Sequence, residues 1–468
     1  MSELMFSRKI DKVYETDVAV IGGGPSGIAS AIAAARGGAK TMLIERYGVL
    51  GGMATMGGVG PFMTSYDRKG NVQLIRGIFE EIVCRLEDEG GGIHPEKVRA
   101  GSSYVSFIVT GHDHCSPFDA EVLKLVTYDI VTEAGVKLLL HSTFVSAICE
   151  DGKIKGVVIT NKSGLQLVKA KIYVDCTGDA DVAANAGVPY ILGNEDGGMQ
   201  PATMFLRMGN VNSEKVKQHF EENKHKVDSV EGGQAKGVFS WIIDKAKENG
   251  DWNIPALTTR YCMGLYESSV PGEWRINTGR ILDIDATDVE ELTRAEIEGR
   301  KQAKMIFKVI KKYVPGCENA NMLDTGAIIG VRETRHIYGQ YLLNEQDLIE
   351  GKEFEDTIAV AANSIDNHGK GGGKGGQYTT IRKDYYCIPY RIMLPQKVNN
   401  LLVSGRPVSA SQDAAAAIRV MPPCFAMGQA AGVAAAICIT DHTYPGQVNI
   451  KKLRERLIEA NAYLGEQI

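Results

Sequence analysis

Three glycines and one acid near the N-terminus have the types and spacing of a dinucleotide-binding site. Gly22, Gly24 and Gly27 form a Gly-x-Gly-x-x-Gly motif, and Glu45 follows Gly22 by 23 residues. The first glycine permits a sharp turn, the second lets a pyrophosphate approach the backbone, and the third allows close helix–strand contact. A carboxylate at the position of Glu45 binds ribose hydroxyls. The alternative is a glycine-rich turn that binds no ligand.

The segments around this motif would position it. Asp17–Ile21 and Thr41–Glu45 are short apolar runs typical of strands, and the alanine-rich segment Pro25–Arg36 predicts a helix. Proline suits the first helical position because its missing N–H group is not needed there. The free N–H groups and the dipole of this helix would face the phosphates. Strand, helix, second strand and terminal acid are in register, which favours dinucleotide binding.

A second group of residues could transfer protons. Asp366 and His368 stand in Ala362–Gly376, a segment that ends in a glycine-rich run. A carboxylate beside an imidazole can supply a general acid or base with a tuned pKa, so we predict that His368 is catalytic and that Asp366 orients it. We also predict that Gly369–Gly376 closes over a substrate. The alternative is a flexible surface connection. The proton-transfer role would then pass to another histidine: His112, His114 or His336.

Two arginines near residue 330 could bind an anion. The polar residues of Gly330–His336 alternate and predict a strand that carries Arg332 and Arg335. Each guanidinium could hold a substrate carboxylate by two parallel hydrogen bonds. Because Glu333 lies between them, both could equally belong to a structural ion-pair network. The sequence leaves these two interpretations open.

Possible metal ligands occur together once, in His112-Asp113-His114-Cys115. No further His/Cys pair stands at matching spacing, so we predict no metal site. The nine cysteines are scattered and never in Cys-x-x-Cys spacing. This pattern argues against a disulfide framework or a redox dithiol, and we expect buried thiols.

Length and composition limit the class of protein. The 468 residues are 44% hydrophobic and 23% charged, which is typical of a globular protein with two or three domains. A net charge of −5 without a basic run argues against a nucleic-acid partner. The N-terminal segment has no apolar signal region, and glycine or polar residues interrupt every later apolar stretch. We therefore expect a cytoplasmic protein without a membrane span.

Later motifs extend the first one. Glu45-Arg46 leads to Gly51-Gly52-Met53-Ala54-Thr55, the strand-like run Ile172–Cys176 ends in Thr177-Gly178-Asp179, and Leu401–Arg406 precedes Arg419-Val420-Met421-Pro422-Pro423. With these motifs the sequence resembles the FAD-dependent oxidoreductases of the glutathione-reductase-like fold, specifically a bacterial group with ERxxxLGGxAT, GxRETRxIxG and LLVxGRxxS…RVMPxCxAMGQAAG segments. The closing segment is the most specific, because simple NAD dehydrogenases have no such return to the first domain.

The resemblance implies FAD as the cofactor. It places the following residues around FAD: Gly22, Gly24, Pro25, Ser26, Gly27, Glu45, Arg46, Gly51, Gly52, Met53, Thr55, Val145, Thr177, Gly178, Asp179, Gly405, Arg406, Arg419, Val420 and Met421. The backbone near Val145 would contact the adenine, and the helix that begins at Met421 would point its positive end at the N1–C2 edge of the flavin. The resemblance also puts Asp366 and His368 close to the flavin. No histidine stands at the covalent-attachment position known in fumarate reductase relatives, so we expect non-covalent FAD.

The same resemblance implies an α/β fold with two domains. We expect a Rossmann-like FAD-binding domain with three β-β-α layers, discontinuous in sequence (residues 1–186 and 391–468), and an inserted α+β substrate (cap) domain (residues 187–390). Apolar residues at helical spacing also predict an amphipathic helix over Asn71–Glu89.

These expectations combine into one functional hypothesis. An FAD-dependent oxidoreductase would transfer a hydride between flavin N5 and a small polar organic substrate by hydroxyl, C–H or enoate chemistry. No second Gly-x-Gly-x-x-Gly follows a strand downstream, so we expect a separate electron donor or acceptor. A homo-oligomer is compatible with the sequence. Two alternatives are a redox-neutral isomerase or lyase and a flavin electron-relay subunit of a larger complex; the absence of clustered cysteines counts against the relay.

Overall fold

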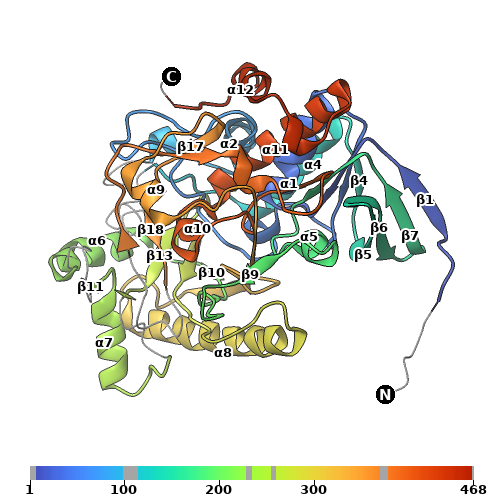
Figure 1. Ribbon diagram of the computed structural model, residues 1–468. Helices are drawn as coiled ribbons and strands as arrows, with labels where there is room; N and C mark the ends of the chain where they lie inside the picture. Colours follow the sequence, from blue (N-terminus) through green and yellow to red (C-terminus); the bar gives the residue numbers. More distant parts are fainter. Residues whose placement is uncertain (1–6, 99–113, 228–234, 255–259, 369–377, 466–468) are drawn as a thin grey trace.

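A five-stranded parallel sheet forms one layer of the protein (Figure 1). The computed structural model describes residues 7–98, 114–227, 235–254, 260–368 and 378–465. The sheet has the order β21-β8-β2-β3-β4, with the bounds β2 (Val18–Ile21), β3 (Thr41–Ile44), β4 (Lys137–Leu139), β8 (Ile172–Asp175) and β21 (Leu401–Val403). Because β21 pairs with β8, a strand from the C-terminal part completes a sheet that the N-terminal part begins.

Both faces of this sheet are covered, which is why β2 is apolar throughout. Val18 and Val20 belong to the core shared with helices α1 (Pro25–Arg36), α2 (Ile78–Asp88), α4 (Ala120–Glu133) and α11 (Met421–Asp441). Ala19 and Ile21 belong to a second core beneath the sheet β1-β7-β6-β5, whose strands are β1 (Lys12–Glu15), β5 (Thr143–Glu150), β6 (Lys153–Asn161) and β7 (Gly164–Lys169). The predicted α/β class with β-β-α layers is confirmed.

Helices α1 and α11 approach each other through glycines. A Cβ atom at Gly428 would lie 2.2 Å from the backbone oxygen of Ser26, and one at Gly432 would lie 2.3 Å from that of Ser30. The Ser30 hydroxyl also donates to the Gly428 carbonyl at 2.9 Å. The C-terminal helix therefore holds α1 in place, backbone against backbone. By length and composition α11 could cross a membrane, but 83% of its most apolar 18-residue window is buried inside the protein.

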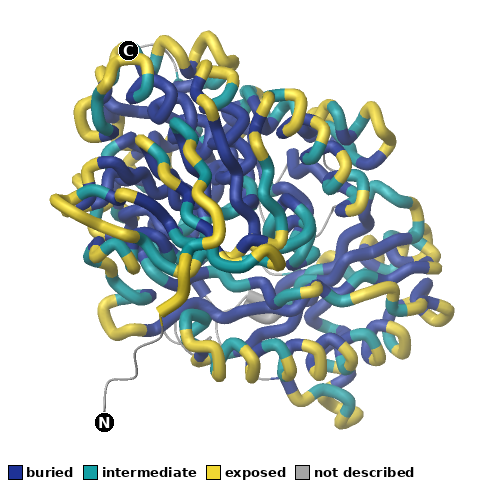
Figure 2. Tube along the Cα trace, turned by 90° about the vertical axis from the view of Figure 1, so that its right-hand side faces the viewer, coloured by how far each residue is buried: buried dark blue, intermediate teal, exposed yellow. Residues whose placement is uncertain are grey.

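A second part of the chain has its own core. Four antiparallel strands in the order β13-β14-β10-β15 pack against long helices, with β10 (Leu206–Gly209), β13 (Gly264–Glu267), β14 (Trp274–Asn277), β15 (Asn321–Thr325), α6 (Ser213–Asn223), α7 (Ser240–Glu248) and α8 (Val289–Tyr313). In α8 the buried residues Ala295, Gly299, Ala303, Ile306 and Ile310 recur at helical spacing, so one face lies on the sheet. Figure 2 shows helices whose inner side is buried and whose outer side is exposed.

The remaining elements connect these parts. They are α5 (Asp181–Asn185), β9 (Tyr190–Leu192), β11 (Ala235–Lys236), β12 (Arg260–Tyr261), β16 (Arg335–Ile337), α9 (Glu345–Glu350), β17 (Thr357–Ala361), β18 (Ile365–Asp366), β19 (Tyr378–Thr379), β20 (Tyr386–Pro389), α10 (Gln412–Ile418) and α12 (Ile450–Glu459). Strands β17 and β20 pack in the same core as α1 and α11. We therefore propose that the chain returns to the first domain near Leu343, earlier than residue 390.

Two expectations about local structure were wrong. The amphipathic helix begins at Ile78 rather than Asn71, because Gly77 adopts φ +63°, ψ −128° just before it; Leu74 and Ile75 are buried without being helical. Of the predicted strand over Gly330–His336, only the end belongs to a strand, β16. Before it, the side chains of Arg332 and Glu333 form hydrogen bonds to Pro201 and Gln200, and these residues do not pair as a strand.

Candidate active site

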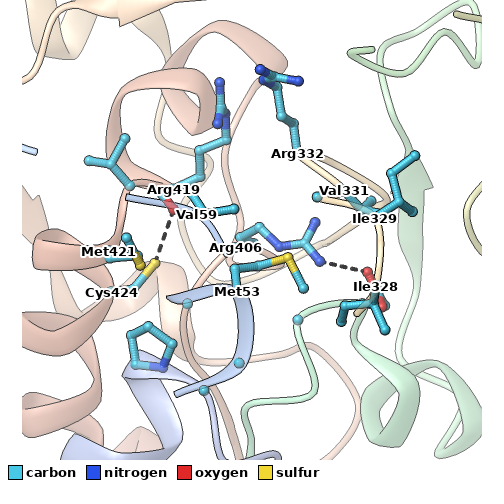
Figure 3. A pocket seen from close by; sticks show the side chains of 18 of the residues that line it. Met53, Val59, Ile328, Ile329, Val331, Arg332, Arg406, Arg419, Met421 and Cys424 are labelled. Atoms are coloured by element: carbon cyan, nitrogen blue, oxygen red, sulfur yellow. Dashed lines mark hydrogen bonds and ion pairs between the residues drawn. The ribbon is translucent and has the colours of Figure 1, made fainter. Parts of the chain in front are cut away.

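One cavity of about 540 Å³ collects residues from distant parts of the chain (Figure 3). Most of the predicted site residues line it: Gly22, Gly24, Pro25, Ser26, Glu45, Arg46, Gly52, Met53, Thr177, Gly178, Asp179, Arg332, Arg335, Asp366, His368, Gly405, Arg406, Arg419, Val420 and Met421. Four do not line it, namely Gly27, Gly51, Thr55 and Val145. A volume of this size is ordinary for a cofactor or small-molecule site.

The glycine motif forms one end of the cavity. Gly22 has φ +101°, and a Cβ there would lie 2.3 Å from the carbonyl oxygen of Cys176. Next to Gly24 the space is open, since the nearest atom to an added Cβ is the Cα of Gly52 at 4.0 Å. Helix α1 starts behind Gly24 with Pro25 in its first turn and without a side-chain cap. Its unbonded N–H groups and dipole therefore provide an anion site at the cavity wall.

Gly27, Gly51 and Thr55 hold the glycine turn and the loop after Glu45 in position, although they do not line the cavity. A Cβ at Gly27 would lie 1.7 Å from the Gly22 carbonyl oxygen, so only glycine allows this helix–turn contact. Gly51, at φ +104°, donates its N–H group to the carbonyl of Gly23 at 2.9 Å. The Thr55 hydroxyl donates to the Leu50 carbonyl at 2.6 Å. Gly51 and Thr55 thus shape the loop that carries Gly52 and Met53 into the cavity.

Glu45 lies at the end of β3 and is buried, with 5% of its surface exposed. Its two carboxylate oxygens accept the N–H groups of Gly23 at 2.6 Å and Tyr47 at 2.7 Å. Burial raises the pKa of Glu45, and these two hydrogen bonds oppose the shift. A carboxylate oxygen has two lone pairs. Each oxygen therefore has a lone pair left that can accept a hydrogen bond from a hydroxyl group in the cavity.

The chain lines the cavity just before Val145, the position predicted near the adenine, and this contact stays a prediction. Ser142, Thr143 and Phe144 line the cavity, whereas the side chain of Val145 is 45% exposed to solvent. Val145 lies at an irregularity in the pairing of β5 with β6, between Phe144 and Ser146, where side chains do not alternate regularly.

An ion-pair group closes the cavity beside Gly178. Arg406 pairs with Asp179 at 2.9 Å, and the Asp179 carboxylate also accepts the Thr334 hydroxyl at 2.8 Å. Arg335 donates to the Asp179 carbonyl at 2.8 Å and pairs with Asp181 at 3.0 Å. Among the described residues, the buried Nη1 of Arg406 has no hydrogen-bond partner. Arg335 is thus held in an ion-pair network, and Arg406 keeps a donor for a ligand.

Glu333 faces away from both of the neighbouring arginines. Its carboxylate pairs with His336 at 2.9 Å and accepts the Gln200 N–H group at 2.9 Å and the Gln412 amide at 2.7 Å. His336 is buried and does not line the cavity. Arg332 is therefore not engaged by the acid next to it in sequence.

Arg332 instead extends into the cavity with two other arginines. Its Nη1 donates to the carbonyl of Pro201 at 2.6 Å and to the Thr203 hydroxyl at 2.7 Å. Figure 3 shows the side chains of Arg332 and Arg419 extending in the same direction, away from Met53. Burial, together with the neighbouring guanidinium groups of Arg280 and Arg419, lowers the pKa of Arg332 well below its usual value.

His368 and Asp366 also lie at the cavity, with 3.5 Å between His368 Nε2 and Asp366 Oδ2. Asn363 stands beside them after β17. The predicted closing segment, Gly369–Gly376, lies outside the described residues, as does His112. His114 stacks on Tyr66 at 4.3 Å between ring centroids and does not line the cavity.

The first turn of α11 also reaches the cavity. Val420 is the N-cap residue, has no side-chain cap and lines the cavity together with Met421. The two prolines that follow, Pro422 and Pro423, have no N–H groups. This helix end therefore presents its dipole and very few donors.

Arg280 and Asn363 were missed in the sequence, although both follow strands. Arg280 comes three residues after β14, and Asn363 comes two residues after the buried strand β17. A polar residue just past a buried strand is the signal that could have found them. No sequence pattern indicated a second group of possible metal ligands, Glu80, Cys84 and His94, whose ligand atoms lie within 4.8 Å of one another. Because Glu80 is already hydrogen-bonded to Gln73 and His94, we assign no metal there.

The layered fold and a cavity that begins at a Gly-x-Gly-x-x-Gly turn define a dinucleotide-dependent enzyme. Residues 17–457 match the family model described as FAD dependent oxidoreductase, and the chain belongs to this family. It is therefore an FAD-dependent oxidoreductase, with FAD as its cofactor.

The curated relatives that match part of the chain are proteins named thiamine thiazole synthase. That of Methanococcus aeolicus is 32% identical over 180 residues, which cover 36% of this chain and 57% of the relative. That of Pyrococcus abyssi is 27% identical over 194 residues, covering 38% and 66%. The chain thus spans less than two thirds of these relatives.

Solved structures also resemble the chain. A geranylgeranyl bacteriochlorophyll reductase-like protein of Thermoplasma acidophilum has a TM-score of 0.45 and 14% identity, covering 96% of this chain and 85% of its own. A p-nitrophenol 4-monooxygenase of Pseudomonas putida has a TM-score of 0.46 and 11% identity, covering 96% and 85%.

The cavity residues fit FAD on three observations. The space beside Gly24 is open for a pyrophosphate, the Glu45 carboxylate has lone pairs left for ribose hydroxyls, and Arg406 has an unpaired buried donor among the described residues. The role of each residue toward the cofactor stays a prediction.

Proposed function

We propose that this enzyme transfers a hydride between non-covalently bound FAD and a small polar organic substrate, and that His368 moves the accompanying proton. FAD, when bound, supplies the two-electron chemistry at flavin N5. The observation that carries the proposal is the shared cavity. The start of α1, the start of α11 and the pair Asp366–His368 all line it, although α1 is more than 300 residues away from the other two along the chain.

Hydride transfer leaves a proton to be moved. An alcohol that loses a hydride from carbon must also release its hydroxyl proton, and an activated alkene that gains a hydride needs a proton at the adjacent carbon. His368 can accept or give this proton, and the Asp366 carboxylate at 3.5 Å would stabilise the imidazolium form. Hydrogen bonds in a catalytic site often shorten only when substrate binds.

The electrons need a second partner. The one other Gly-x-Gly-x-x-Gly match, at residues 371–376, belongs to a glycine-rich run and does not directly follow an apolar run in the sequence. We therefore propose that a separate donor or acceptor reaches the flavin from outside the chain, rather than a nicotinamide domain within it.

The substitution His368→Asn tests the proton-transfer role. We expect unchanged FAD content and visible spectrum, but flavin reduction at least about 100-fold slower, the lower end of what a general acid or base contributes. The measurement is anaerobic stopped-flow bleaching with whichever compound of a hydroxy acid, sugar and enoate panel reduces the wild-type flavin.

A matched control is His442→Asn. His442 caps α11 at φ +54°, far along the helix from the cavity, and asparagine tolerates this left-handed conformation. The control should bleach at the wild-type rate. Near-normal bleaching in His368→Asn would remove His368 from the mechanism.

A further inference from the structure

Three arginines converge on one part of the cavity wall. Arg280, Arg332 and Arg419 all line the cavity, and the charges of Arg280 and Arg419 both act on the pKa of Arg332. Like charges repel at short range, so an anion that binds among these guanidinium groups would be stabilised by them.

The acids nearby compensate only part of this charge. Among the described residues, Asp366 is the one carboxylate whose charge acts on both Arg332 and Arg419. Asp366 also pairs with His368. Glu333 acts on Arg419 as well, but its oxygens are bound by His336, Gln200 and Gln412. Arg332 and Arg419 together therefore carry more positive charge than the Asp366 carboxylate compensates.

Hydrogen-bond donors are also left over. Arg332 donates to protein atoms through Nη1, and no described residue accepts from its Nε or Nη2. Arg419 makes two contacts of 3.4 Å through Nη2, and its buried Nε has no partner among the described residues. A guanidinium has five N–H donors in a planar fork that matches a carboxylate.

Asn363 adds an independent observation. Its side chain is 2% exposed and lines the cavity, yet within the described part of the chain neither its amide oxygen nor its amide nitrogen has a partner. A buried amide without partners costs about 1–3 kcal/mol. Such a group points to a polar ligand atom that both accepts and donates, such as a hydroxyl.

The position of the arginines separates them from the pyrophosphate end. Arg332 rests on Pro201 and Thr203, and Arg419 contacts Gln200, all in the segment that follows β9. The pyrophosphate end is formed by the turn between β2 and α1 instead.

We propose that the substrate is a small organic acid whose carboxylate is bound by Arg332 and Arg419, with Arg280 adding positive charge and Asn363 contacting a neighbouring polar group. This inference rests on the proposed function and specifies its substrate class. It also assigns Arg419, which the sequence had suggested as a cofactor contact, to the substrate.

Binding of simple anions to the FAD-loaded enzyme tests the proposal. Malonate, malonamide and inorganic phosphate are titrated at constant ionic strength, and flavin absorbance and thermal unfolding are recorded. Malonate should perturb the flavin and raise Tm, whereas malonamide should bind at least about tenfold more weakly because it has no charge. Arg332→Gln and Arg419→Gln should each weaken malonate binding about 10- to 100-fold.

Two further variants make the result decisive. Arg36→Gln removes an exposed arginine that pairs with Glu81 and should bind malonate as the wild type does. Arg332→Lys keeps the charge but loses the planar fork, so its affinity should be intermediate, and its FAD content reports correct folding. Flavin bleaching is not measured, so a failure of the hydride-transfer proposal would not obscure this result.

Three outcomes would overturn the proposal. One is a wild-type enzyme that malonate does not perturb, or that binds malonamide as tightly as malonate. Another is unchanged malonate affinity in both glutamine variants at full FAD content. The third is tighter binding of phosphate than of malonate, which would assign the subsite to a phosphate ester.

Discussion

Glu45 stabilises the fold with the same two oxygens that we predict to bind the ribose of the cofactor. Its carboxylate closes the turn after β2 by accepting the Gly23 N–H group and holds the loop after β3 by accepting that of Tyr47. Both bonds use lone pairs on the protein side, which leaves the others for the cavity. A carboxylate here is therefore part of the wall even before a ribose binds.

The substitution Glu45→Gln should lower FAD affinity about tenfold or more, because the amide offers one acceptor oxygen and puts an NH₂ group against a backbone donor. FAD content after purification and fluorescence titration of the apoprotein measure this effect. Glu15→Gln, at an exposed acid of β1, is the control. Wild-type FAD affinity in Glu45→Gln would mean that the ribose is bound elsewhere.

Arg332 and Arg335 show that residue type alone does not decide a role. They are three positions apart, and both line the cavity. Arg335 is neutralised by Asp181, whereas Arg332 donates to a carbonyl and a hydroxyl and has no carboxylate acceptor among the described residues. The partners, not the side chain, separate the structural arginine from the one available to a ligand.

At the scale of elements, the contact between α1 and α11 positions both helix ends at the cavity. The glycines of α11 bring its backbone against Ser26 and Ser30, which belong to the first turns of α1. The N-terminus of α1 can therefore move only if α11 moves with it. A change in the packing of these two helices would therefore also change the geometry of the cavity.

We expect Gly428→Ala to destabilise the enzyme by about 1–3 kcal/mol and to reduce its FAD content, because the new methyl group would collide with the backbone of Ser26. Thermal unfolding and flavin absorbance measure the two effects. In the control Gly446→Ala, the methyl group meets only the end of the Gln340 side chain at 3.3 Å. Equal Tm and FAD content in both variants would contradict the proposed coupling.

At the scale of the whole molecule, β8 joins the first and last parts of the chain. It lies between β2 and β21, and its final residue, Asp175, is fully buried. The Asp175 carboxylate accepts the N–H and hydroxyl of Thr177 at 3.0 and 2.7 Å and the N–H of Ala183 at 2.9 Å. Burial raises its pKa from an ordinary value of 3.8 to about 6, despite these bonds.

This shift predicts a pH dependence of stability. Because the folded-state pKa is raised, the contribution of Asp175 is fully present below about pH 4 and is lost as pH rises through about 6. Asparagine does not titrate, so the Tm of Asp175→Asn relative to wild type should rise from about pH 4 to 7, most steeply between pH 4 and 6. The total change is at most about 3 kcal/mol.

A constant offset is expected as well, since the asparagine amide cannot accept from Ala183, but this offset does not vary with pH. Asp88→Asn, at an exposed acid of α2, should give a flat difference over the same range. A flat difference for Asp175→Asn would show that the carboxyl titrates alike in the folded and unfolded protein.

The sequence by itself determined the local features. The strand–turn–helix around Gly22 and the acid at the end of the second strand could be predicted, because φ angles, apolar periodicity and helix-end chemistry depend on neighbouring residues. The β-β-α class was predicted from the resemblance to a known family instead. The start of α2 could not be placed, since Leu74 and Ile75 are buried from a loop and mimic a helical pattern.

Only the tertiary structure decided which polar groups face one another. Glu333 is adjacent to Arg332 in sequence but contacts His336 and Gln412, while Arg280 and Arg419 come from 52 residues before and 87 residues after Arg332. Charge compensation acts through space at a few ångströms and is independent of separation along the chain. For that reason the sequence indicated Arg332 as a possible anion-binding residue, but not that Arg280 and Arg419 line the same cavity.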